Sequence, residues 1–431
     1  MHSRNLLASS FGNILEWFDF ALFIFLAPVI GENFFPSHDM HSATLAALGV
    51  FAAGFIARPI GGILFGHIGD RNGRSKTLLY SILLVTLATF FTGFLPTYAN
   101  IGILAPILFT GFRILQGLSV GGEYSGIMVY LAESAPNHRR GFITSFAATG
   151  ANIGFLLATV VVMLLKFLLP LSAILAWAWR LPFIIIGALG LIIFYFRLKL
   201  IETPAYLHLK KTRRIEKQPL LSALRSAPGA LLKILGITCV SSTFYYVFFG
   251  YMPQYLNQNL NISSSLAFAL QSLALLLMLF LVPLAAICGD RFGRKKMLII
   301  STLCILTLTL PSFYLLNTRA ISAIALALSI ATIICSIDQG NSLTAVVENC
   351  PLNVRYSGVS FSYNLGNALF GGTAPLIVNL LTTHMSNIAP AYYLMGMGVV
   401  SLIAILTLAN ANKINFLATI SQSKEEPIIN S

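Results

Sequence analysis

Long apolar runs separated by short polar turns dominate the sequence. Twelve of them reach about 20 residues, the length that a helix needs to cross the hydrocarbon core of a bilayer. They lie at approximately 8–31, 43–66, 77–96, 103–131, 142–168, 181–200, 231–255, 265–288, 297–316, 320–347, 357–383 and 390–411. Because a spanning segment must satisfy its own backbone hydrogen bonds, such runs fold as helices. The sequence therefore predicts an all-α membrane protein with twelve transmembrane helices.

Composition agrees with a membrane setting. Hydrophobic residues make up 57% of the 431 residues and charged residues 10%, which lies outside the range of soluble globular proteins. The net charge of +13 does not indicate a nucleic-acid partner, because the Lys and Arg residues stand in short turns between apolar runs. The five cysteines lack the spacing of metal or redox motifs, so we expect no disulfide, metal or cofactor.

The positions of the basic residues also predict the orientation. With the N-terminus placed inside, 22 of the 27 Lys and Arg residues fall in cytoplasmic segments. Lys166, Arg180 and Arg319 fall in outer segments, and Arg58 and Arg113 fall within the membrane. The positive-inside rule therefore places both termini in the cytoplasm. The N-terminus leads directly into a run that contains Glu16 and Asp19, unlike a signal peptide, so we expect the first helix to stay in the mature protein.

Two motifs occur once in each half of the chain. The part of the charged, Gly-rich turn at 69–76 recurs at 289–296 with an offset of 220 residues, and the spacing E-x-x-P-x-x-x-R recurs with an offset of 215. Such duplication predicts two six-helix bundles related by pseudo-two-fold symmetry. The expected bundles are 1–200 and 231–412, joined by a cytoplasmic linker at 201–230 and followed by a short cytoplasmic tail at 413–431.

The charged residues of the two motifs are predicted to act as cytoplasmic gates rather than substrate contacts. An Asp near a helix N-terminus and neighbouring Arg residues can hold two helices together in one state and release them in another. We expect Glu133 to pair with Arg140, and Glu348 to pair with Arg355. The full set comprises Asp70, Arg71, Arg74, Asp290, Arg291, Arg294, Glu133, Arg140, Glu348 and Arg355.

Six ionisable residues lie inside the apolar runs. They are Glu16, Asp19, Arg58, Arg113, Glu123 and Asp338. Each costs roughly 2.5–3.5 kcal/mol within the hydrocarbon, so each requires a partner or a water-filled cavity. The first two are three residues apart and share a helix face. We consider two hypotheses for these carboxylates: a structural ion pair with Arg58 or Arg113, or a proton carrier that titrates. Both need the same residue types, so the sequence leaves both open.

Asp338 is the sharpest candidate for a proton-coupling residue. It occupies the position of Glu123 in the second half, at the offset of 215 residues. Glu123 has Arg58 and Arg113 available in its own half, whereas Asp338 has no evident cation, and desolvation favours the neutral form of an unpaired carboxyl. A hydrogen-bonded acid at a helix contact is the alternative. The candidate set for proton coupling is Asp338, Asp19, Glu16 and Glu123.

Several segments resemble those of the metabolite:H⁺ symporter family of the major facilitator superfamily. The repeated turn, G-x-x-x-D-R-x-G-R-x-K, is similar to the superfamily signature loop, and the hallmark segments of the family are matched at 12–20, 54–62, 113–124 and 179–183. The resemblance covers about residues 10–410. It implies the major facilitator fold and import of proline and betaine, 2-oxoglutarate, citrate, shikimate or dicarboxylates into bacteria.

The C-terminal half is most similar to proline/betaine transporters of that family, at 245–246, 251–253, 354–357 and 390–395. The resemblance places the first and seventh helices beside a central cavity, where aromatic faces attract ammonium groups. The implied substrate contacts are Trp17, Tyr245, Tyr246 and Tyr251, with Arg113 for a carboxylate. Packing is the alternative for any single ring. Osmosensing members carry a C-terminal coiled coil, and because 413–431 has no heptads we expect no osmotic control of that kind.

The resemblance implies a proton-coupled importer that works by alternating access in the inner membrane of a bacterium. A proline-like or betaine-like zwitterion is the favoured substrate, and a dicarboxylate, 2-oxoglutarate or citrate symporter is the alternative. Efflux is disfavoured because 149–154 lacks the proline of the efflux signature. No nucleophile motif or phosphate loop indicates an enzyme. The expected partners are a small-molecule substrate, protons and the lipid bilayer, and the protein is expected to be a monomer.

Overall fold

The fold is helical throughout the described part of the chain. The computed structural model describes residues 3–36, 40–212 and 215–408, and none of these is in a strand. Eleven helices are long and apolar enough to cross a membrane, and the bent pair Phe11–Phe25 and Ala27–Phe34 can serve as a twelfth span. The prediction of an all-α membrane protein with twelve transmembrane helices is confirmed. The tail at 413–431 lies outside the described residues.

The first half of the chain contains the helices up to residue 197. They are α1 (Ser3–Phe25), α2 (Ala27–Phe34), α3 (Met40–Asn72), α4 (Arg74–Thr92), α5 (Tyr98–Ile101), α6 (Leu104–Ser134), η1 (Asn137–Arg139), α7 (Arg140–Leu168), α8 (Leu171–Ala173), η2 (Ile174–Ala178) and α9 (Arg180–Arg197). Two short helices, α10 (Pro204–Lys211) and α11 (Pro219–Ser226), follow in the linker.

The second half repeats this arrangement. It contains α12 (Pro228–Tyr245), η3 (Tyr246–Tyr251), α13 (Met252–Leu260), α14 (Ser264–Phe292), α15 (Arg294–Asn317), α16 (Ile321–Glu348), η4 (Leu352–Val354), α17 (Arg355–Gly366), η5 (Asn367–Gly371), α18 (Ala374–His384) and α19 (Ala389–Leu406).

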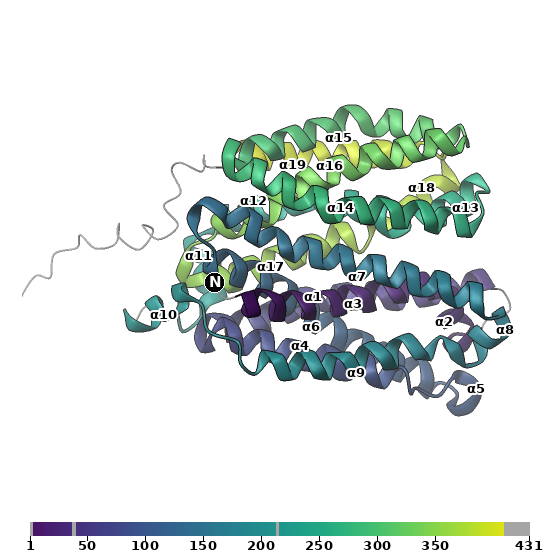
Figure 1. The fold of residues 1–431 in the computed structure, drawn as a ribbon, viewed down its shortest axis with the longest axis horizontal. Coiled ribbons are helices and arrows are strands. Elements are labelled where there is room, and N and C mark those ends of the chain that lie inside the picture. Colours follow the sequence, from purple (N-terminus) through teal and green to yellow (C-terminus); the bar gives the residue numbers. More distant parts are fainter. Residues whose placement is uncertain (1–2, 37–39, 213–214, 409–431) are drawn as a thin grey trace, which may run out of the picture.

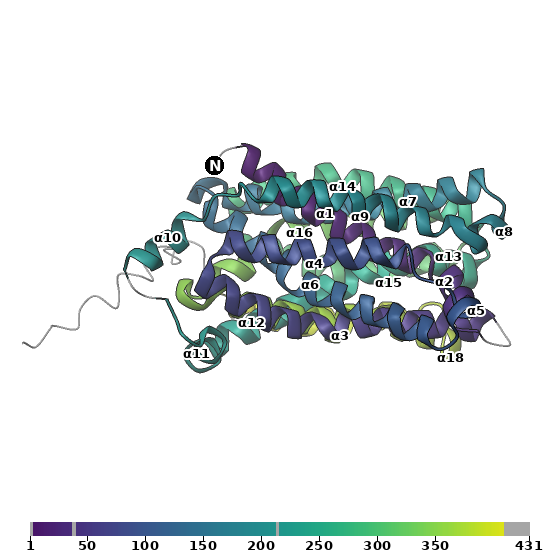
Figure 2. The same cartoon turned by 90° about the horizontal axis from the view of Figure 1, so that it is seen from below.

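The long helices run side by side, so the molecule has two ends (Figure 1). We call one the basic end; it carries Arg74 and Arg294 at the turns after α3 and α14, and α10 and α11 lie there in both views (Figure 2). The opposite end carries α2, α5, α13 and α18. Figure 1 shows α14, α15, α16 and α19 on one side and α1, α4, α6 and α9 on the other. The halves meet where α3 packs along α17 and α7 packs along α14.

Prolines break three of the spans in ways that the sequence explains. Pro28 stands in the first turn of α2, and the chain bends by 69° between α1 and α2. Pro253 follows the π turn η3 and cannot donate a hydrogen bond to the Phe249 carbonyl four residues earlier. Gln271 of α14 donates to that carbonyl instead, at 2.9 Å. The π turn η5 likewise precedes Pro375.

Glycines let α3 approach its neighbours closely. A Cβ on Gly121 of α6 would collide with the backbone carbonyl of Arg58 on α3, and a Cβ on Gly66 of α3 would lie 2.8 Å from the Cα of Ser357 on α17. Small residues at such crossings allow close backbone packing between transmembrane helices. Gly66 therefore sets how tightly the two halves meet at the basic end.

Replacement of Gly66 tests this contact. We expect Gly66→Leu to lower the melting temperature in detergent by several degrees, because overpacking of a tight contact costs about 1–3 kcal/mol. Gly111→Leu is the matched control, since Gly111 lies on an exposed face of α6 and a Cβ there meets nothing within 4 Å. Equal melting temperatures for the two variants would contradict the interpretation.

Candidate functional site

Buried charges link the two halves at the basic end. In the first half, Arg74 lies 3.2 Å from Asp70 and 3.2 Å from Glu133. The turn before Arg74 depends on Gly73, whose φ of 115° is a conformation that side chains other than glycine rarely adopt. Arg355, the first residue of α17, lies 3.5 Å from Glu133. Glu133 therefore binds one arginine from each half.

The second half contains the symmetry-related arrangement. Arg294 lies 2.8 Å from Asp290 and 3.2 Å from Glu348, and it too follows a glycine, Gly293, with a φ of 97°. Arg140, the first residue of α7, lies 3.1 Å from Glu348. Glu348 thus also binds one arginine from each half.

These pairs correct a prediction from the sequence. We expected Glu133 to pair with Arg140 and Glu348 with Arg355, within one half, but the two arginines exchange partners across the halves. The reason is the packing of the helices that the arginines begin. α17 lies against α3 and α6 of the first half, and α7 lies against α14 and α16 of the second.

The two signature carboxylates bind helix N-termini in the other half. The Asp70 carboxylate accepts hydrogen bonds from the backbone N–H groups of Tyr356 (3.3 Å) and Ser357 (2.9 Å). The Asp290 carboxylate accepts from Gly141 (2.9 Å) and Phe142 (3.0 Å). A carboxylate is stabilised there by the unpaired N–H groups and by the helix dipole. Both contacts exist only while the halves are together at the basic end.

Arg71 and Arg291 do not join this network. Both side chains are exposed, and Arg71 lies beside His67. The linker contributes in their place: the Glu202 carboxylate accepts from the backbone N–H groups of Arg74 (3.1 Å) and Ser75 (3.2 Å) at the start of α4. The Tyr206 hydroxyl donates to the Arg71 carbonyl at 2.7 Å, and partial burial and the Glu202 carboxylate raise the pKa of Tyr206.

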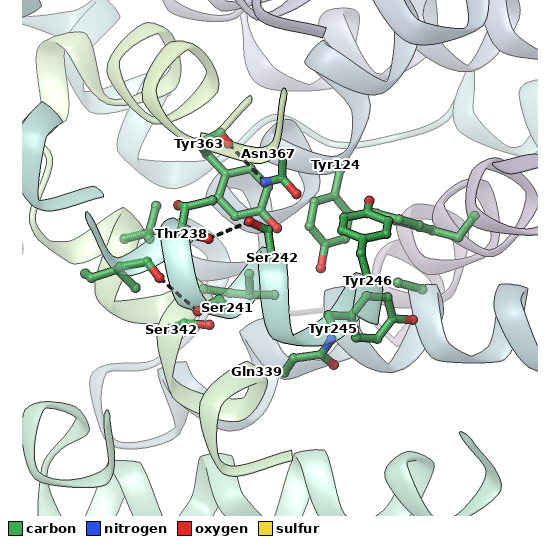
Figure 3. Close-up of a pocket in the computed structure, with 15 residues that line it drawn as sticks. Tyr124, Thr238, Ser241, Ser242, Tyr245, Tyr246, Gln339, Ser342, Tyr363 and Asn367 are labelled. Carbon is green, nitrogen blue, oxygen red and sulfur yellow. Dashed lines mark hydrogen bonds between the residues drawn. The ribbon is translucent and has the colours of Figure 1, made fainter. Parts of the chain in front are cut away.

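A cavity lies between the halves at the centre of the molecule (Figure 3). Its volume is about 30 Å³, room for about two water molecules. Five aromatic residues line it, together with neutral polar and aliphatic side chains. The lining residues are Trp17, Tyr124, Ala151, Ile237, Thr238, Ser241, Ser242, Tyr245, Tyr246, Gln339, Ser342, Leu343, Val346, Tyr363 and Asn367. None of these described residues is charged at neutral pH.

Hydrogen bonds between amides and hydroxyls connect the halves around this cavity. The Tyr245 hydroxyl donates to the side-chain carbonyl of Asn152 at 3.0 Å, and the Asn152 amide donates to Gln339 at 3.0 Å. Asn152 belongs to α7, and its partners belong to α12 and α16. Our sequence analysis did not select Asn152 or Gln339. The sequence does contain a feature that could have identified them, because each is a polar residue inside an apolar run.

The predicted substrate contacts separate into two groups. Trp17, Tyr245 and Tyr246 line the central cavity. Tyr251 lies nearer the opposite end, where its hydroxyl accepts a hydrogen bond from Asn379 at 2.9 Å. Arg113 is absent from the cavity lining among the described residues.

Arg113 is instead bound to Asp19. The two side chains form an ion pair of 2.9 Å, and Gln116 bonds to both of them. The rings of Phe20 and Phe23 lie 4.3 and 4.4 Å from the guanidinium carbon. This pair satisfies the expectation that a carboxylate of the first helix has a basic partner, and it leaves Arg113 away from the cavity.

Glu123 has a partner that we did not predict. Sequence analysis offered Arg58 and Arg113, but Arg197, at the end of α9, lies 2.5 Å from the Glu123 carboxylate, and Ser81 donates to it as well. We counted Arg197 among the cytoplasmic residues, but it is in fact buried, and it also donates to the Leu78 carbonyl at 2.7 Å. It lies in the last turn of α9, so this helix end packs inside the protein.

Glu16 and Asp338 are buried carboxyls without a bound cation. Neither oxygen of either group has a hydrogen-bond partner among the described residues. Asp338 is 3% exposed and lies behind the cavity wall, next to the hydroxyls of Ser241 and Ser342. No ion pair to Asp338 occurs within the described ranges. Asp338 therefore lies beside two residues of the cavity lining, Ser241 and Ser342.

The opposite end is open where the basic end is closed. Two hollows of about 350 and 330 Å³ lie between the halves there. They share lining residues from α1, α3, η3, α13 and α18: Ile24, Leu48, Gly250, Gln254 and Asn379. Together they form a cleft whose volume suits a small molecule.

Comparison with known proteins places the chain in a family. The Major Facilitator Superfamily model matches residues 9–375. The glycine betaine/proline/ectoine/pipecolic acid transporter OusA of Dickeya dadantii is 36% identical over 410 residues, covering 92% of this chain and 81% of the relative. The proline/betaine transporter of Escherichia coli is 35% identical over 410 residues, covering 93% and 82%.

A solved structure shares the fold. The proton:xylose symporter XylE of E. coli superposes with a TM-score of 0.76 at 20% identity, over 94% of this chain and 96% of that one. With its helical bundles and its family match, this chain is a multi-pass membrane transporter and not an enzyme. It belongs to the major facilitator superfamily, as the sequence motifs predicted, and its relatives are proline/betaine transporters.

The exchanged ion pairs predict which charge swap restores transport. Arg140→Glu alone sets two carboxylates against each other, and Glu348→Arg alone brings its arginine beside Arg140 and Arg294. Breaking a buried pair in this way costs about 3 kcal/mol or more, so uptake should fall to background. The double variant Arg140→Glu/Glu348→Arg should recover part of the uptake, measured in whole cells. The control is Glu133→Arg/Arg140→Glu, the pairing expected from sequence, which should recover none. Recovery in the control alone would refute the exchange.

Proposed function

We propose that the protein is a proton-coupled importer of a small zwitterion, with proline or a betaine as the favoured substrate. The names of the relatives support this substrate class. The observation that carries it here is the central cavity, whose lining combines five aromatic rings with neutral polar groups. Aromatic faces attract an ammonium group, and a net-neutral site suits a ligand whose own charges cancel.

The same observation weighs against the alternative substrates. A dicarboxylate or citrate carries two or three negative charges, and burying them requires cations in the site. The described cavity lining supplies none, Arg113 is already bound to Asp19, and Arg58, which lies against the lining, can neutralise a single carboxylate.

Alternating access is the mechanism that this arrangement supports. We infer that the basic end faces the cytoplasm, in the inner membrane of a bacterium, and that each half moves as one bundle of a monomer. The present state is then closed inside by the exchanged ion pairs and by the contacts of Asp70 and Asp290 with helix N-termini, while the cleft opens outward. Inward opening requires all of these contacts to break together.

Proton coupling is assigned to a buried carboxyl. Asp338 is the first choice because it is buried, has no cation and lies behind the cavity serines Ser241 and Ser342. Burial favours the neutral form of such a carboxyl, and contact with water favours its release of the proton. Asp19 is the second choice, since its ion pair with Arg113 would break on protonation.

Substrate exchange in proteoliposomes tests the substrate class. Vesicles loaded with unlabelled solute should take up labelled proline or glycine betaine by counterflow, and should not take up citrate or 2-oxoglutarate. Trp17→Leu should raise the KM for glycine betaine by roughly tenfold, because loss of a cation–π contact in a dry site costs about 1–2 kcal/mol. Counterflow of citrate without proline or betaine would reject the proposal.

A carboxyl-to-amide replacement tests the coupling residue. Asp338→Asn should abolish accumulation driven by an imposed pH gradient and should keep counterflow, because exchange needs no net movement of protons. Wild-type accumulation should collapse on addition of a protonophore. If Asp338→Asn still concentrates substrate, Asp19 becomes the candidate, and Asp19→Asn is assayed in the same way.

A further inference from the structure

Arg58 is a buried cation that the gates and the proposed proton path do not use. It lies on α3 and is 0% exposed. Its Nε donates to the side-chain carbonyl of Asn364 at 3.1 Å, and its Nη1 donates to the Tyr246 hydroxyl over a long 3.4 Å. Its Nη2 has no hydrogen-bond partner among the described residues. A buried guanidinium with an unused donor is unfavourable unless a ligand or water completes it.

Two aromatic side chains of the central cavity lie against this guanidinium. Tyr246 and Trp17 both line the cavity, and the Arg58 guanidinium carbon lies 5.8 Å from the centre of the Trp17 ring. Tyr246 is the first residue of the π turn η3, at the break before Pro253. At about 30 Å³ the cavity cannot hold a molecule the size of proline, so ligand entry must displace part of this wall.

We propose that Arg58 is the binding site for the substrate carboxylate in this cavity, with Tyr246 as the group that covers it between transport events. This inference rests on the proposed function. When the Tyr246 hydroxyl swings off Nη1, two guanidinium donors, Nη1 and the unused Nη2, face the cavity. A carboxylate accepts two parallel hydrogen bonds from such a pair, and the ammonium group of the same molecule is held by the aromatic rings.

The other buried arginine close to the first helix does not fit this role. Arg113 also has two donors without a partner among the described residues, Nε and Nη2, but its charge is already neutralised by Asp19, and it is absent from the described cavity lining. Arg58 has no such ion pair: Glu16 interacts with it electrostatically but has no hydrogen-bond partner among the described residues. Glu16 balances the charge of Arg58 without occupying its donors.

The test compares a single variant with a charge-balanced one. Proline, glycine betaine, 2-oxoglutarate and citrate are first tested for counterflow with the wild type in proteoliposomes. The KM is then measured for each of these solutes that the wild type exchanges. Arg58→Gln should raise that KM roughly 10- to 100-fold, and Glu16→Gln/Arg58→Gln should raise it to the same extent. Arg58→Lys should show a smaller rise, because it keeps the charge but loses the planar pair of donors. Size-exclusion profiles establish that each variant is folded.

Arg180→Gln is the matched control. It removes an arginine that lies over Trp179 toward the opposite end, so the KM should not change. Two results would overturn the inference. One is a wild-type KM in Glu16→Gln/Arg58→Gln, which would mean that Arg58 only balances the charge of Glu16. The other is an unchanged KM in Arg58→Gln. The two proposals can also fail separately. If the wild type does not exchange proline or betaine, but Arg58→Gln raises the KM for another carboxylate, the proposed substrate is rejected and the role of Arg58 is retained.

Discussion

Two carboxylates at the basic end, Glu133 and Glu348, each bind one arginine from their own half and one from the other half. These four contacts are buried, so the cost of leaving any one charge unpaired is high and the contacts form or break as a set. The closed basic end, the small cavity and the open cleft at the opposite end all follow from this set being formed. Under the proposed alternating access, this set is the contact that breaks when the basic end opens.

Within the membrane, polar groups form separate clusters rather than one network. Asp19 is paired with Arg113, and Glu123 is paired with Arg197. Unused hydrogen-bonding capacity remains at several buried ionisable groups among the described residues, including Glu16, Arg58, Arg113 and Asp338. Of these, Glu16, Arg58 and Asp338 also lack an ion pair in the described ranges. Groups that fold stability does not use are available to a ligand or a proton, because binding there completes hydrogen bonds that the protein leaves open. The pairing of the buried charges therefore separates the groups that stabilise the fold from the groups that a ligand or a proton can complete.

The local sequence accounts for most of the fold. Run length and the positive charges of the turns predict the helices and their alternation, because the bilayer demands internally bonded spans of fixed length. The repeat offsets of 220 and 215 residues predict that the halves resemble each other. The positions of Asp70 and Asp290 at the basic end follow in the same way. Pro28, Pro253 and Pro375 mark the breaks, since proline lacks an N–H group.

Pairing was decided by the tertiary structure alone. Glu133 and Arg140 are seven residues apart in the sequence, yet Glu133 binds Arg355, because a pseudo-two-fold arrangement sets α17 against the first half and α7 against the second. Arg197, in the last turn of α9, pairs with Glu123 of α6, a contact between two helices that are remote in the chain. The sequence by itself determined which charged residues are present and which helix or turn carries each of them, but not how deeply each is buried, as Arg197 shows. Which of them are neutralised, and which stay open to a ligand, depends on distances between helices that are remote in the chain, and residue spacing carries no information about these.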